Sequence, residues 1–305
     1  MNDRIRRPGA AVSTGGAHAP GADWIDRAPQ AGGIERIEAF FHDTAYDLHR
    51  HDTYAIGRTL SGVQRFHYRR SLRDSLPGGT MVLHPDEAHD GEAGTAEGFR
   101  YRMVYVEPAL FQQALGGKPL PFIEGGLSRD PRLFAATETL LQAVDHPLDL
   151  LEQDDAIFDL AIALDAVSGA RATQRIADYP AAERARQYLH DFVDEAVTLD
   201  ELAVASGRDK WSLSRDFRAL FGTSPHRYLT MRRLDRVREL AALGVRLVDA
   251  SAAAGFADQS HMTRHFTKAW GVSPSRWLKM VNPGMVNPGL VNPGTAHIRT
   301  RRKPA

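Results

Sequence analysis

The last third of the chain before residue 281 contains one pattern twice, and this repeat constrains the fold more than any other feature of the sequence. In each copy a leucine precedes a glycine by eight residues: Leu199 and Gly207 in the first, Leu247 and Gly255 in the second. In each copy a later phenylalanine precedes another glycine by five residues, and a Ser-Pro pair follows that glycine. The period of about 48 residues indicates a duplicated supersecondary unit.

The second copy has the pattern of a helix-turn-helix. The small residues 250–254 allow two helices to approach closely, and Gly255 permits a sharp turn between them. Asp258 can cap the next helix, in which Met262 and Phe266 begin an apolar stripe that Ala269 and Trp270 continue. The opposite face carries side chains of the types that contact base edges and phosphates, namely Gln259, Ser260, Thr263 and Arg264.

The first copy predicts the same arrangement. Thr198 and Glu201 have the spacing of a capping box, and a second helix from about Asp209 turns Leu213 and Phe217 inward. A helix over 228–243 joins the two copies. The outward positions of the first copy are Lys210, Trp211, Ser214, Arg215 and Arg218. Burial of Trp211 against the joining helix is an open alternative.

Residues 181–280 resemble the DNA-binding domain of the AraC family of transcription regulators. The matching signature is Arg233-Leu234, Gly255-Phe256, Ser260, Arg264, Phe266, Gly271 and Ser273-Pro274. The resemblance implies that Trp211, Ser214 and Arg215 reach bases and that Arg218 contacts phosphate. It also implies that Gln259, Ser260, Thr263 and Arg264 face the DNA groove, and that Arg233 is a structural residue.

Charge is divided unevenly along a chain whose formal net charge is zero. Residues 181–280 hold 16 basic and 12 acidic side chains, whereas residues 1–180 hold 18 basic and 26 acidic ones. A basic C-terminal half fits a DNA-binding role, and an acidic N-terminal half indicates a different task. The chain has no cysteine, which excludes disulfides, thiolate nucleophiles and cysteine-ligated zinc.

Residues 34–108 show short alternating runs separated by Gly and Pro turns, which predicts an antiparallel barrel or sandwich. The pattern resembles a degenerate cupin, in which His49, His51 and His89 occupy positions that hold metal in metal-dependent relatives. The expected carboxylate is absent, because Ala55 and Ile56 stand there. We therefore expect no metal, no cofactor and no catalysis, although histidines lining the barrel mouth and a three-imidazole metal site both stay open.

We instead predict a small-molecule site inside the barrel. Its candidate residues are His49, His51, Tyr54, Arg65, His67, His89, Tyr101 and Tyr105. For each aromatic residue the alternative is an ordinary core position.

The remaining segments complete a predicted order of two domains. A disordered lead (1–33) precedes an all-β cupin-like barrel with appended helices (34–170), which serves ligand binding or dimerisation. A linker (171–180) leads to the all-α double helix-turn-helix domain (181–280). A disordered basic tail (281–305) carries three Val-Asn-Pro-Gly repeats. Without a membrane-length apolar run or a signal-peptide pattern, we expect a cytoplasmic protein.

The sequence predicts a transcription regulator, not an enzyme, that binds double-stranded DNA and responds to an unknown small molecule. By resemblance, activation through RNA polymerase is the expected mode, and a homodimer is open. Two alternatives are a constitutive DNA-binding regulator with a purely structural barrel and a metal-dependent cupin enzyme fused to a DNA-binding module.

Overall fold

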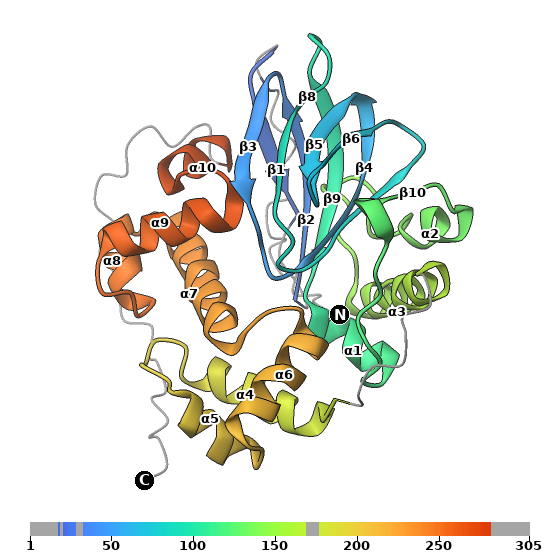
Figure 1. The fold of residues 1–305 in the computed structure, drawn as a ribbon. Helices are drawn as coiled ribbons and strands as arrows, with labels where there is room; N and C mark the ends of the chain where they lie inside the picture. Colours follow the sequence, from blue (N-terminus) through green and yellow to red (C-terminus); the bar gives the residue numbers. More distant parts are fainter. Residues whose placement is uncertain (1–17, 19–20, 29–32, 169–176, 282–305) are drawn as a thin grey trace, which may run out of the picture.

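The computed structural model describes residues 18, 21–28, 33–168 and 177–281, and the fold is shown in Figure 1. Two antiparallel sheets form the N-terminal half. The first has the order β1-β2-β9-β4-β7-β10 and the second the order β3-β8-β5-β6. The strands are β1 (Trp24–Arg27), β2 (Ile34–Phe41), β3 (Thr44–His49), β4 (Tyr54–Gly62), β5 (Gln64–Tyr68), β6 (Ser71–Ser75), β7 (Thr80–Leu83), β8 (His89–Ala93), β9 (Phe99–Val106) and β10 (Leu127–Ser128).

Strand β9 explains how the larger sheet is buried on both faces. Phe99, Tyr101 and Met103 point to the interior between the sheets, which is filled mainly with aromatic and methionine side chains. Val104 and Val106 belong to a separate core on the outer face. This alternation follows from the two-residue period of a strand. The barrel interior is therefore packed with side chains.

Three helices cover the outer face of the larger sheet: α1 (Pro108–Leu115), α2 (Pro131–Ala136) and α3 (Leu150–Val167), with the short turn η1 (Glu124–Gly126) between the first two. Asp130 and Asp149 cap α2 and α3 by accepting hydrogen bonds from backbone N–H groups. Leu133 of α2 and Leu160 and Leu164 of α3 face the sheet and are fully buried. The barrel and these helices form one β-rich unit.

The C-terminal half is helical and contains the duplicated unit. Its helices are α4 (Tyr179–Asp191), α5 (Leu199–Ser206), α6 (Lys210–Phe221), α7 (Pro225–Ala242), α8 (Leu247–Ala253), α9 (Gln259–Trp270) and α10 (Pro274–Val281). The capping box of Thr198 and Glu201 is present, and Asp209 and Asp258 cap α6 and α9. Gly222 and Gly271 end these helices in the left-handed conformation, with φ of 72° and 65°. The predicted capping box, the predicted cap at Asp258 and the predicted helix start near Asp209 are confirmed.

The structure differs from the sequence expectation at several places. Strand β1 lies within the lead that was expected to be disordered, because Ile25 is buried and Arg27 pairs with Glu35 on the neighbouring strand. Helix α4 begins inside the predicted linker, with Pro180 in its first turn. Strands β3, β6 and β8 had no clear alternation and were missed. Most of the repeat-bearing tail lies outside the described residues, and so does most of the lead. None of the described helices is long and apolar enough to cross a membrane.

Candidate functional site

Helix α6 presents a polar face with one large exposed aromatic ring. Trp211 is 63% exposed, and the Lys210 ammonium lies 5.7 Å from the centroid of its ring. Arg215 and Arg218 are exposed and are held along the helix by the hydroxyls of Ser212 and Ser214. The alternative that Trp211 packs against the joining helix is excluded by its exposure.

Helix α9 presents the equivalent face in the second unit. Gln259, Ser260 and Arg264 are exposed and Thr263 is half-buried, while Met262 and Phe266 form the buried stripe. Within the described part of the chain, Arg264 has no hydrogen-bond or ion-pair partner. Its guanidinium group is therefore free to meet a base or a phosphate.

Arg233 has the structural position that the resemblance implied. Its Nε donates a hydrogen bond to the Val193 carbonyl and its Nη2 donates one to the Glu195 carbonyl, both at 2.7 Å. These bonds tie α7 to the loop between α4 and α5. Arg233 thus fixes the joining helix to the first unit.

A cavity of about 610 Å³ lies between the barrel and the joining helix α7. Aromatic and apolar side chains from both halves form part of its wall, namely Ile25, Ile37, Tyr46, Tyr105, Met231, Trp270 and Trp277. The barrel interior is filled with side chains in the described residues, and this cavity opens against α7.

Buried ion pairs cross the cavity between the two halves of the chain. The Arg232 guanidinium lies 3.1 Å from the Asp52 carboxylate and also pairs with Glu107, and Arg238 lies 2.6 Å from Glu35. Burial alone would raise the pKa of Glu35, but Arg238 and Arg27 outweigh it and hold this pKa below its ordinary value. Removing one partner would leave a buried charge uncompensated.

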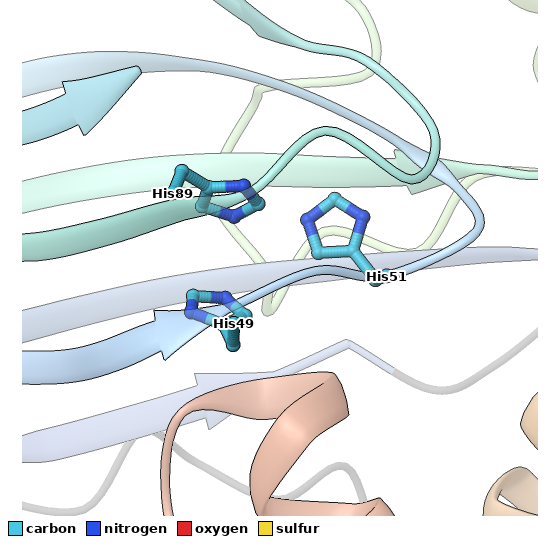
Figure 2. Close-up of side chains that lie close together, drawn as sticks. All are labelled: His49, His51 and His89. Carbon is cyan, nitrogen blue, oxygen red and sulfur yellow. The ribbon is translucent and has the colours of Figure 1, made fainter. Parts of the chain in front are cut away.

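Three buried histidines meet at the end of β3, as Figure 2 shows. The ring centroid of His89 lies 4.3 Å from that of His49 and 4.8 Å from that of His51. Each Nδ1 lies 2.8–2.9 Å from a backbone carbonyl two residues away, on Asp47, Thr53 and Glu87. Burial lowers the pKa of all three imidazoles, to about 4 for His89. The rings are therefore neutral near pH 7.

The donor set of this cluster fits a transition metal in type. One nitrogen from each ring can serve as a ligand, and these three nitrogens lie within 4.8 Å of one another. Neutral imidazole is a ligand for zinc, iron, nickel and copper. The positions where the cupin resemblance expects a carboxylate hold the buried residues Ala55 and Ile56, so the protein ligands would be histidines alone.

Only some of the other residues predicted to bind a ligand lie near the cavity or the histidine cluster. Tyr105 lines the cavity, and the centroid of its ring lies 5.4 Å from that of His51. Tyr101 is buried in the barrel interior, where its hydroxyl oxygen lies 2.9 Å from that of Tyr46. Tyr54 points the other way, beneath α1, and donates a hydrogen bond to the Pro121 carbonyl.

The inward orientation expected for Arg65 and His67 is wrong. Arg65 pairs with Asp74 at 2.8 Å and His67 with Asp90 at 2.9 Å, both on the outer surface. Phe66 and Tyr68 take the inward positions of β5, so the assumed phase of the strand was off by one residue.

Sequence reasoning missed several residues of the cavity wall. Arg232 and Arg238 are two of several basic residues on the joining helix, and their acidic partners Asp52 and Glu35 are 180 and 203 residues away in the sequence. Trp270 was predicted as part of the buried stripe of the second unit, and Trp277 had no predicted role in the cavity. These four residues come from three different helices, α7, α9 and α10, so no local pattern in the sequence groups them.

Two family models match the chain. The AraC-like ligand binding domain matches residues 31–164, and a helix-turn-helix domain matches residues 202–280. An uncharacterised HTH-type transcriptional regulator of Bacillus subtilis, YbfI, is 26% identical over 220 residues, which cover 70% of this chain and 80% of the relative.

Solved structures of ToxT from Vibrio cholerae have the same fold. One crystal form aligns with a TM-score of 0.59 and 11% identity, over 82% of this chain and 99% of ToxT. ToxT with a bound unsaturated fatty acid aligns with a TM-score of 0.55 and 11% identity, over 86% and 95% of the two chains. At this identity the likeness shows the fold alone.

Proposed function

Because the chain belongs to the AraC family of transcription regulators, with its ligand-binding domain ahead of its helix-turn-helix domain, we propose that a small molecule bound between them controls how it reads DNA. The chain is a transcription regulator and not an enzyme. We assign the sensor to residues 34–170 and DNA binding to residues 181–280. The observation that carries the proposal is the cavity between the barrel and α7.

DNA recognition is assigned to the exposed faces of α6 and α9. In the first unit it uses Lys210, Trp211, Ser214, Arg215 and Arg218, and in the second Gln259, Ser260, Thr263 and Arg264. An Arg can bond guanine bidentately and a Gln can bond adenine, whereas Arg218 suits a phosphate. Two such helices on one chain suit successive major grooves, about 34 Å apart.

The proposed effector is a carboxylic acid with an apolar body. The cavity volume lies in the range of small-molecule sites, and its wall combines aromatic rings with arginines. Arg232 and Arg238 are already paired, whereas Arg236 lines the cavity and has no ion-pair partner among the described residues. ToxT structures contain an unsaturated fatty acid and an aryl butenoic acid, which are of this class.

The proposed mechanism is a shift between two arrangements of the halves. A ligand that binds one spacing of α7 and the barrel better than the other changes the relative positions of α6 and α9. The ligand's differential affinity for the two arrangements sets the size of the response. We assign the regulator to activation, through contact with RNA polymerase in the cytoplasm.

A homodimer through α3 is part of the proposal. Leu151, Phe158 and Ile162 lie on one stripe of this helix and are 72%, 51% and 44% exposed. An apolar stripe of this kind is typical of a surface that a second copy covers. Phe158→Glu should convert a dimer to a monomer in light scattering, and a wild-type monomer would overturn this assignment.

The function is tested by fluorescence anisotropy with the DNA that flanks the gene, at fixed salt, with and without cell extract. We expect saturable binding that resists random competitor and changes when extract is added. Arg236→Gln should abolish the response to an acidic extract fraction and leave ligand-free binding intact. Specific binding that no extract or carboxylic acid alters would support the constitutive alternative. No specific binding would contradict the proposed operator.

A further inference from the structure

Helix α9 carries two histidines one turn apart, outside the set of residues assigned to DNA contact. His261 and His265 are both half-buried, and their Nε2 atoms lie 2.9 Å apart. Their ring centroids lie 4.6 Å apart, with the ring planes at 79°. Because residues four apart lie on the same face of a helix, the backbone of α9 holds the two rings together.

The turn before α9 supports both rings. The Phe256 ring centroid lies 5.9 Å from that of His261 and 6.3 Å from that of His265. The Asp258 carboxylate accepts a hydrogen bond from the His261 N–H at 2.7 Å, which fixes the first turn of the helix. Within the described part of the chain, neither imidazole makes a hydrogen bond other than the one between the two rings. The pair is therefore preformed, and no other partner uses its nitrogens.

The spacing of the two nitrogens fits one coordination geometry. Bonds from a metal ion to imidazole are about 2.0–2.1 Å long, so two nitrogens at a right angle on one ion are about 2.9 Å apart, and tetrahedral ones about 3.4 Å. The observed 2.9 Å matches the right angle, which is typical of Cu²⁺ and Ni²⁺ in square-planar or tetragonal sites. Without an ion, one neutral ring donates its Nε2 hydrogen to the other ring.

We propose that His261 and His265 chelate a divalent metal ion of the copper or nickel type on α9. Two histidines at this spacing on one helix face are a known arrangement of metal ligands. Among the described residues, no third histidine or carboxylate forms a metal-binding group with them, so water would fill the other positions. The proposal departs from the sequence expectation of no metal, and it places the ion on the helical half of the chain.

The charges near the pair limit its affinity for a cation. His226, Lys268 and Arg227 act on His265 as positive neighbours. The Arg227 guanidinium lies 2.7 Å from the Asp86 carboxylate, which offsets part of this repulsion. Burial holds the pKa of His265 below its ordinary value, so its ring is neutral near pH 7 and can serve as a ligand. We therefore expect a reversible site that responds to the concentration of free ion.

The consequence for DNA binding rests on the proposed function. His261 is three residues from Arg264, and side chains at this spacing are neighbours on a helix surface. A bound ion would add two positive charges beside the exposed Arg264 guanidinium, where the two neutral rings have none. Positive charge near the phosphates raises DNA affinity and makes it depend more steeply on salt.

The site itself is tested with the metal-free full-length protein and Ni²⁺ in titration calorimetry, without DNA. The double variant His261→Ala/His265→Ala should lose one equivalent of binding, and each single variant should bind that equivalent at least about tenfold more weakly. Alanine favours helices, and circular dichroism would establish that the variants are folded. The control is His226→Ala, which should keep the equivalent. If the double variant binds as the wild type does, or if the control loses the equivalent, the proposed site is wrong.

Hydrogen exchange locates the ion, also without DNA. A chelate across one turn should slow exchange of the α9 amides at least about threefold in the wild type and leave them unchanged in the double variant. Equal slowing in both would place the ion elsewhere and overturn the site.

The coupling to DNA is tested by fluorescence anisotropy over a range of salt concentrations. Ni²⁺ should steepen the slope of log affinity against log salt by about one in the wild type, and leave it unchanged in the double variant. A Ni²⁺ equivalent that is lost in the double variant but leaves the slope of the wild type unchanged would overturn the coupling. Absence of specific DNA binding without Ni²⁺ would contradict the proposed function and leave the calorimetric result standing.

Discussion

The two helix-turn-helix units share one pattern, but they are supported differently. The first unit has a separate hydrophobic core, which α4, α5 and α6 form together and to which Ala109 of α1 also belongs. The buried residues of the second, from Ala250 to Met280, are continuous with those of α7 and of the barrel interior. Gly222 packs on the side chain of Pro85, whereas Gly271 packs on the backbone of Asp47.

The difference indicates a division of labour within the duplicated domain. The end of α9 is joined to the segment 47–50 by backbone hydrogen bonds, so we expect the second unit to move together with that segment. The first unit meets Pro85 only through a side-chain contact at Gly222, which restricts movement less. Helices α9 and α10 lie beside β3 and β1 at one edge of the barrel, and α4–α6 lie below it (Figure 1). The barrel therefore restricts the position of α9 more than that of α6.

The largest effects should come from the matched pair Phe217→Ala and Phe266→Ala, which occupy equivalent buried positions in the two units. Each should lower the free energy of unfolding by about 3–5 kcal/mol, because a large cavity forms in a packed core. Only Phe266→Ala should also increase amide exchange in β3. Equal disturbance of β3 by both variants would break the distinction between the units.

Arg232→Met should also cost about 3–5 kcal/mol in urea unfolding, because Asp52 and Glu107 lose the charge that compensates them. Arg236→Met is the control on the same helix, where the described residues offer no ion-pair partner. It should change stability by less than about 0.5 kcal/mol. Similar losses in both would show that the crossing ion pairs do not hold α7 to the barrel.

Gly271→Ala should destabilise the protein by about 2 kcal/mol or more, because it adds a backbone clash to left-handed strain. Its Cβ would lie 2.4 Å from the Asp47 carbonyl oxygen, while one at Gly244 meets nothing within 4 Å. Gly244→Ala should therefore cost only the strain, about 1 kcal/mol. If thermal unfolding shows that Gly244→Ala destabilises the protein as much as Gly271→Ala or more, the close contact between Gly271 and Asp47 is refuted.

Arg264→Ala should weaken specific DNA binding by about 1–3 kcal/mol, as expected for loss of one base contact. Anisotropy against specific and random DNA separates base reading from positioning, and equal loss on both would assign Arg264 to the backbone. The control is Arg132→Ala on α2, which belongs to the barrel half and not to the helix-turn-helix domain. It should leave the affinity for specific DNA unchanged.

Removal of residues 281–305 should have the smallest effect. Four basic residues there contribute weak phosphate attraction that salt screens. Operator affinity at physiological salt should fall by less than about threefold. A tenfold or greater loss would assign a DNA contact to this segment.

The sequence predicted what is local in this fold. Leucine, glycine and proline spacings located both helix-turn-helix units, and Thr198, Asp209 and Asp258 marked helix starts that the structure confirms. It predicted the β-rich half less completely, because strands such as β3 and β6 lack alternation. The histidines of one cluster were identified because the barrel pattern places them at strand ends.

The remainder depends on contacts between distant segments. The phase of β5 is decided by which side chains fill the barrel, and no neighbour in the chain determines it. The cavity exists only where α7 meets β2 and the loop before β4. Arg238 and Glu35 belong to different halves, so no local pattern joins them.

The most direct test of the account is native-state hydrogen exchange of the full-length protein, read separately for α6 and α9. If the barrel holds the second unit, amides of α9 and β3 should open together, with one free energy and one response to denaturant. Amides of α6 should open at a lower free energy. Exchange of α9 that matches α6 and is independent of β3 would contradict the central claim.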